Sequence, residues 1–196
     1  MQAIRIIHDE HRALAALLHG MLYLVRQIRY RGAKPNFDVF EAMVYYIHAF
    51  PERFHHPKEE KYLFRILRVR NPGAALVLDR LQVEHRASGD KIRTLERALA
   101  RYQQEGSELL APFGAAVADY AAFHWAHAGA EENVLLPQAE AFLTAADWEE
   151  IDAAFAGHSD PLVGAEAGAE YATLFRRIVN MAPPPLGVGP DLSGIA

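Results

Sequence analysis

The chain has 196 residues, 51% of them hydrophobic and 23% charged, and these values are typical of a soluble globular protein with one main domain. Its formal net charge of -5 at pH 7 gives no basic footprint for nucleic acid, and the absence of Cys excludes disulfides, iron–sulfur clusters and thiol chemistry. No pattern is typical of a signal peptide or a membrane span, so we expect a cytoplasmic protein with neither a membrane nor a nucleic-acid partner.

Helical periodicity dominates the sequence, and strand signals are nearly absent. Apolar residues recur every three or four positions, and Gly or Pro residues mark the ends of these runs. We therefore expect long helices over about residues 3–31, 38–69, 74–104 and 109–142. Long helices joined by short loops predict an all-α fold, an up-down-up-down four-helix bundle.

Two shorter helices and a tail are expected after the bundle. The segment from Thr144 to Asp147 is typical of a capping box and predicts a helix that ends near 156. A further helix is expected over 165–181, followed by a Pro/Gly-rich tail. The predicted organisation is a bundle over 1–143, a helical extension over 144–182 and a flexible tail over 183–196. The extension is a candidate surface for a homodimer contact or a protein partner.

Several of the ten His residues belong to a duplicated pattern. Glu10-His11-Arg12 recurs as Glu84-His85-Arg86, and His55-x-x-x-Glu59-Glu60 recurs as His127-x-x-x-Glu131-Glu132. The duplication predicts two helical hairpins that face each other, each with one copy of both motifs.

The second helix concentrates its polar residues on one stripe, since successive residues of an α-helix rotate by about 100°. His48, Glu52, His55 and Glu59 lie on that stripe, whereas His56 is expected at its edge. The last helix repeats the design with Tyr120, His124, His127 and Glu131. Pro51 and Pro57 lie off the stripe of the second helix, and each is expected to bend it, because proline lacks a backbone N–H.

The helix lengths place these side chains at one height in the bundle. His11 and His85 lie in the middle of the apolar stripes of the first and third helices. A single buried His is ordinarily a hydrogen-bonded core residue, but a duplicated, level set favours a metal site over that interpretation. The predicted ligands are His11, His55, Glu59, His85, His127 and Glu131. Further candidates, as additional ligands or as residues that contact the ligands, are His48, His124, Glu52 and Tyr120.

Two bridging carboxylates would give each of two ions two nitrogens and two oxygens, and leave positions for a shared oxygen and a ligand such as O₂. Mixed imidazole and carboxylate ligation suits non-haem iron, with manganese and zinc as alternatives.

These residues resemble the hemerythrin-like, or HHE cation-binding, family, in a bacterial branch. The family pattern H…HxxxE…H…HxxxE is met by the six predicted ligands and covers about residues 3–142. The resemblance implies a four-helix bundle that holds an oxo- or hydroxo-bridged di-iron centre and binds, senses or reacts with O₂, nitric oxide or peroxide. One position departs from hemerythrin, which has a second His four residues after the first on the third helix. Here that position is Gly89, and His48 and His124 are candidates to compensate.

Three functions stay open at this point. The first is a di-iron protein that binds or senses a diatomic ligand or peroxide. The second is an enzyme of the peroxidase, oxidase or nitric oxide reductase type, so whether the chain is an enzyme is undecided. The third is iron storage or delivery, or a structural metal site with every coordination position closed.

Overall fold

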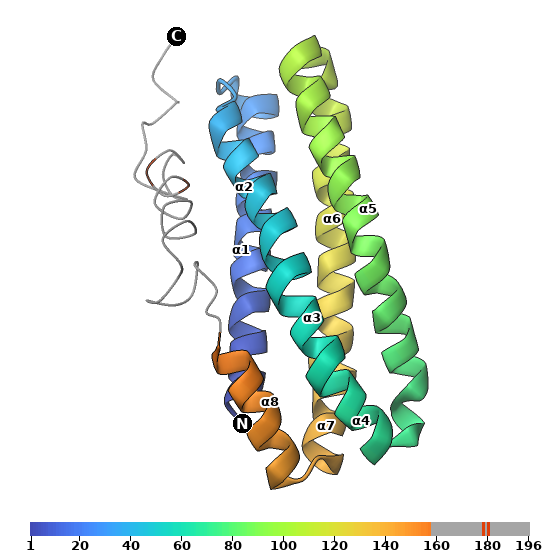
Figure 1. The fold of residues 1–196 in the computed structure, drawn as a ribbon. Coiled ribbons are helices and arrows are strands. Elements are labelled where there is room, and N and C mark those ends of the chain that lie inside the picture. The colour runs from blue at the N-terminus through green and yellow to red at the C-terminus, as the bar shows by residue number, and fades with distance from the viewer. Residues whose placement is uncertain (158–177, 179, 181–196) are drawn as a thin grey trace.

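The computed structural model describes residues 1–157, 178 and 180, and its long helices lie side by side in an up-down-up-down bundle (Figure 1). The first is α1 (Gln2–Arg31) and the third is α5 (Ala75–Glu105). The second contains α2 (Phe37–Phe50), α3 (His56–Lys58) and α4 (Arg65–Arg70), and the fourth contains α6 (Leu110–Ala130) and α7 (Leu136–Phe142). The predicted all-α bundle is confirmed. We call α1 to α4 the first hairpin and α5 to α7 the second hairpin.

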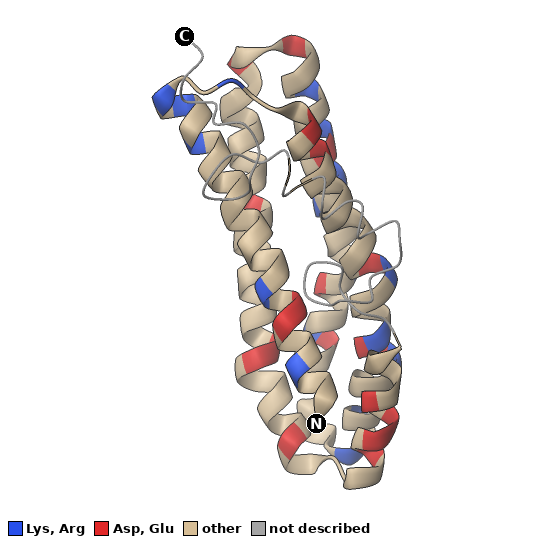
Figure 2. Cartoon of the chain, turned by 90° about the vertical axis from the view of Figure 1, so that its left-hand side faces the viewer, with Lys and Arg blue, Asp and Glu red and all other residues tan. Residues whose placement is uncertain are grey.

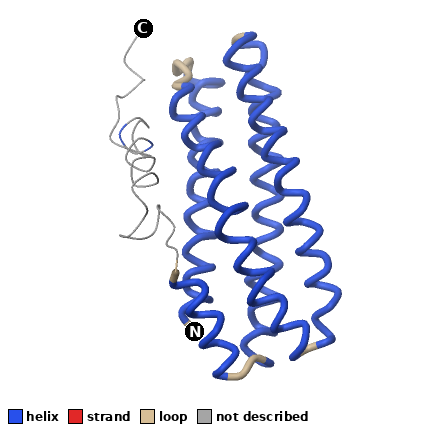
Figure 3. The backbone as a smooth tube through the Cα atoms, viewed as in Figure 1, coloured by secondary structure: helices blue, strands red, loops and turns tan. Residues whose placement is uncertain are grey.

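The ends of the helices follow the expected stop and start signals. Gly32 ends α1 with a φ of 67°, a left-handed conformation that glycine adopts without strain. Asn36 precedes α2, and its side chain accepts a hydrogen bond from the backbone N–H of Val39. The tube view shows that the loops joining the bundle helices lie at its two ends (Figure 3).

The second and fourth helices contain π-helical turns that the sequence did not predict. These turns cover Pro51–His55, Glu59–Phe64 and Glu131–Leu135, all within or beside the duplicated motifs. A π turn holds more residues than an α turn, so the residues on either side of it lose their α-helical register. The α-helical wheel for residues 48–59 is therefore wrong across Pro51–His55. The positions that this wheel predicted for His48 and His56 are not those that the structure shows.

A polar layer divides the interior of the bundle. One apolar cluster packs residues of α1, α2, α5 and α6 toward the end that holds Gly32, and a second packs residues of α1, α4, α5, α7 and the extension at the opposite end. Between them lie the buried polar side chains: Glu10, His11, His55, Lys58, Glu59, His85, Ser88, His124, His127 and Glu131. The two clusters fix the spacing of the helices, and the polar layer lies between them.

The extension begins with α8 (Ala145–Ala156), which turns back along the first hairpin (Figure 1). Its predicted capping box is present, since Thr144 and Asp147 exchange side-chain to backbone hydrogen bonds. Asp152 accepts a hydrogen bond of 2.7 Å from the backbone N–H of Ala3, one of the free donors at the start of α1. The predicted helix over 165–181, apart from positions 178 and 180, and the tail lie outside the described residues.

None of the described helices combines the length and the apolar character needed to cross a bilayer. On the face seen in Figure 2, charged residues of both signs are interspersed.

Candidate metal centre

Four imidazoles, one from each helix of the bundle, meet in the polar layer. They form two close pairs, each within one hairpin. Nε2 of His11 lies 3.1 Å from Nε2 of His55, and Nε2 of His85 lies 3.2 Å from Nε2 of His127. All four side chains are buried, so the pairs face each other inside the bundle.

Two carboxylates join the imidazole pairs. Glu131 places Oε2 3.1 Å from Nε2 of His11 and Oε1 3.5 Å from Nε2 of His127. Glu59 places Oε1 3.3 Å from Nε2 of His55 and Oε2 3.6 Å from Nε2 of His85. Each carboxylate thus has one oxygen toward each pair. The structure brings together all six residues that the sequence predicted as ligands.

The central carboxylates have no hydrogen-bond donor. Both oxygens of Glu59 and of Glu131 are buried, and their contacts with the imidazoles lack hydrogen-bond geometry. Burying a charged group without a partner is costly. A cation between each imidazole pair and its two oxygens removes this cost. The donor set therefore fits a pair of divalent cations.

Each central imidazole also contacts a glutamate on its outer side. The Nδ1–H groups of His55, His127, His11 and His85 donate to Glu10 (2.6 Å), Glu84 (2.9 Å), Glu132 (2.9 Å) and Glu60 (2.9 Å), respectively. Such bonds fix the tautomer in which Nε2 is free to bind a metal, and they raise the basicity of the ring.

The outer glutamates follow the duplication. Glu10 and Glu84, which precede His11 and His85 in sequence, bind the other His of their own hairpin. Glu60 and Glu132, the second acids of the Glu-Glu doublets, bind a His of the opposite hairpin. Sequence reasoning assigned these four residues no role, although their presence in both copies of the motifs was a usable signal.

Burial and the neighbouring carboxylates shift the pKa values of the central imidazoles in opposite directions. Burial alone lowers the pKa of His11, but the carboxylates of Glu131 and Glu132 outweigh it and raise the pKa to about 9. Burial also opposes the charged form of His55, yet Glu59 and Glu10 raise its pKa well above the usual value. A metal ion must displace these protons, so metal binding weakens as pH falls.

His48 does not reach the centre. It is half exposed on the surface, and its Nδ1 lies 2.6 Å from Oε1 of Glu96 on α5. The candidate role of His48 as a compensating ligand or as a contact of the ligands is therefore wrong. The π turn at Pro51–His55 adds a residue between His48 and His55, which rotates His48 off the inner stripe.

His124, Tyr120 and Glu52 do lie beside the centre. The His124 ring is 6.0 Å from the His11 ring, and burial lowers the pKa of His124 to about 3, so the imidazole is neutral. Nε2 of His124 is buried without a hydrogen-bond partner. Ser88 interacts with both Glu52 and Tyr120, and burial raises the pKa of the tyrosine.

His56, which the sequence placed at the edge of the stripe, points inward instead. Its side chain is 13% exposed and stacks on the ring of His85, with 4.1 Å between the ring centroids. Burial lowers the pKa of His56 to about 4.

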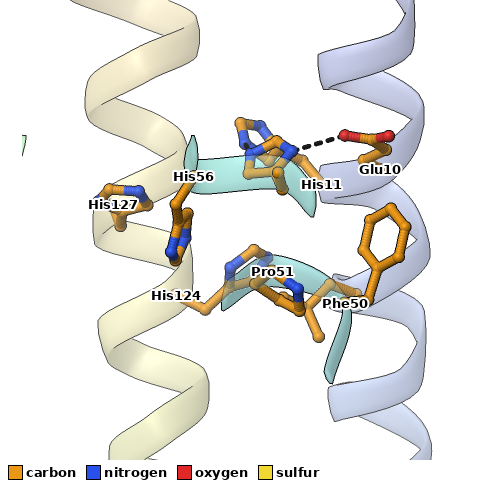
Figure 4. Close-up of a pocket in the computed structure, with 9 residues that line it drawn as sticks. Glu10, His11, Phe50, Pro51, His56, His124 and His127 are labelled. Atoms are coloured by element: carbon orange, nitrogen blue, oxygen red, sulfur yellow. Dashed lines mark hydrogen bonds and ion pairs between the residues drawn. The ribbon is translucent and has the colours of Figure 1, made fainter. Parts of the chain in front are cut away.

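A small cavity of about 20 Å³, partly open to solvent, lies against the centre. Figure 4 shows His11, His56, His124 and His127 around this space, with Phe50 and Pro51 from the second helix. Leu14, Glu10 and His55 complete its lining. The cavity thus gives a small molecule a path to the imidazoles.

Comparison with known proteins gives one match. The family model described as the hemerythrin HHE cation binding domain matches residues 2–139. The match includes all six central residues and ends within α7, before α8. No curated protein and no solved structure matches the chain.

Proposed function

The chain belongs to the hemerythrin HHE cation-binding domain family, and on that premise we propose that it holds two iron ions and binds or senses O₂, nitric oxide or peroxide at them. The observation that carries the proposal is the arrangement of two imidazole pairs linked by two carboxylates whose oxygens have no other partner. In this arrangement His11 and His55 would hold one ion and His85 and His127 the other, and Glu59 and Glu131 would each offer one oxygen to either ion.

Iron is the proposed metal because imidazole and carboxylate donors together suit non-haem iron, with manganese and zinc as alternatives. Iron supplies reversible redox chemistry and a coordination position for an exogenous ligand. The protein's own residues hold the imidazoles in one tautomer through the outer glutamates, and the two apolar clusters flank the polar layer on either side.

The cavity supports a small ligand. Leu14, Phe50 and Pro51 line it with apolar atoms, and the imidazoles line it with polar ones. A diatomic molecule or peroxide fits such a space, whereas a large charged substrate would lose its hydration against these walls.

Turnover of peroxide is the second candidate function, and His124 is the observation that favours it. Its imidazole is buried and neutral, lines the cavity and has an unpartnered Nε2. Such a group is placed to accept a hydrogen bond from a peroxide in the cavity. His124→Leu would remove that group, so a lower turnover rate with unchanged metal content would favour the enzyme.

The metal content and visible spectrum of aerobically purified protein test the proposal. We expect two irons per chain, near-ultraviolet and visible bands, and a spectral change when nitric oxide or peroxide is added. A reversible O₂ adduct would favour binding or sensing, and multiple turnovers of peroxide would favour the enzyme. Colourless protein that binds no iron after anaerobic loading would contradict both.

A further inference from the structure

The duplication places most of the site in matched positions, so its exceptions are informative. Aligning His55 with His127 pairs Glu59 with Glu131 and Glu60 with Glu132. The same alignment pairs His56 with Ala128, so one additional imidazole beside the centre has no counterpart in the other hairpin.

His56 lies beside the metal position of the second hairpin, although it belongs to the first. Its ring stacks on His85 with an interplanar angle of 13°, and its centroid is 5.7 Å from that of His127. One ring nitrogen of His56 lies within 4.8 Å of ligand nitrogens of both His85 and His127. These three side chains therefore form a compact nitrogen cluster.

The partners of His56 do not account for its burial. Nδ1 is buried with no hydrogen-bond partner, and the closest acid, Glu52, is 3.5 Å away without hydrogen-bond geometry. A purely packing role would need no nitrogen, and Phe64 already stacks on His85, with 5.4 Å between the ring centroids. The packing of His56 therefore explains its ring but not its buried nitrogen, which is free to bind a metal ion.

The other metal position has no equivalent group. His124, the additional imidazole nearest to it, lies 6.0 Å from His11 between ring centroids and does not join the cluster of His11, His55, Glu59 and Glu131. The counterpart of His56 there is Ala128, which has no donor atom.

We infer that His56 is a third imidazole ligand of the ion held by His85 and His127, so that the two metal positions are unequal. This inference rests on the proposed di-metal function. It replaces the sequence-based expectation that His48 or His124 would compensate for Gly89.

Stepwise metal titration of His56→Phe tests the inference, because phenylalanine keeps the stacked ring and removes both nitrogens. The probe is Co²⁺, measured by calorimetry and visible absorption on the full chain. We expect two ions in the wild-type protein, and in His56→Phe one ion unchanged and the other bound at least tenfold more weakly. His48→Phe, the same change at an exposed His of the same helix, should leave both ions unchanged.

Equal binding of both ions by His56→Phe and wild type would overturn the inference and leave the di-metal proposal standing. A wild-type protein that binds no Co²⁺ would overturn both. If His56→Phe does not fold, NMR of the Co²⁺-loaded wild type decides the question: hyperfine-shifted rings from five histidines support the inference, and four contradict it.

Discussion

The first and second hairpins carry the same set of three central residues in different surroundings. Each contributes an imidazole pair, a central carboxylate and two outer glutamates. The first hairpin has two π turns and packs against α8, whereas the second hairpin has one π turn. The six central residues follow the duplication, since each hairpin supplies two imidazoles and one carboxylate to the polar layer. The surroundings are free to differ.

Removing one imidazole from each hairpin should have the largest effect. His55→Ala with His127→Ala takes one nitrogen from each pair, so we expect loss of both metals while the circular dichroism stays helical. Metal analysis checks this, and His19→Ala with His48→Ala is a matched double control at surface positions. Full metal content in the double variant would contradict the ligand assignment.

The outer glutamates allow the two hairpins to be compared directly. Glu10→Ala and Glu84→Ala remove equivalent partners, and loss of such a partner weakens metal affinity by roughly 10- to 100-fold. We expect the larger loss for Glu10, because it is 3% exposed and Glu84 is 20% exposed. Competition with a chelator gives both affinities. Equal losses would show that burial of the glutamate does not matter.

Protonation should distinguish the metal-free from the loaded protein. The pKa of His11 is raised from 6.5 to about 9 in the folded chain, so its contribution to stability is present below pH 6.5 and is lost as pH rises toward 9. The melting temperature of metal-free protein should therefore fall over that range. The loaded protein, in which a metal replaces the proton, should not show this fall, and a flat metal-free profile would be evidence against protonated His11.

The extension should affect stability without affecting the metal. Thr144→Ala removes the N-cap of α8 and is expected to cost about 1 kcal/mol. Thermal unfolding measures the loss, and metal content should not change. Asp152→Asn serves as a companion, because it weakens only the contact with the start of α1.

A stronger coupling of α8 to the centre would contradict this prediction. Lys58 provides the route for it, since Nζ lies 3.9 Å from Oε1 of Glu10 and 4.9 Å from the ring centroid of Phe155. If Thr144→Ala lowered metal affinity, α8 would have to be counted among the elements that hold the first pair in place.

Periodicity and duplication were sufficient to predict the bundle and the convergence of six residues, because both depend on regular helical spacing. The capping box of α8 was equally local and equally predictable. That these residues bind metal stays a prediction, supported by the family and by the unpartnered carboxylates.

The π turns explain what the sequence did not predict. One added residue in the Pro51–His55 turn shifts the inner face by about 100°, which moves His48 outward. His56, beside a second π turn, lies inward against His85. The outer glutamates were missed for a different reason, because their partners are imidazoles on neighbouring helices, which a wheel of one helix does not contain.

Anomalous diffraction from crystals of the iron-loaded protein tests the central claim most directly. The account predicts two iron peaks, one beside the His11 and His55 pair and one beside the His85 and His127 pair, with Glu59 and Glu131 contacting both. A single peak, or iron bound outside the polar layer, would contradict it.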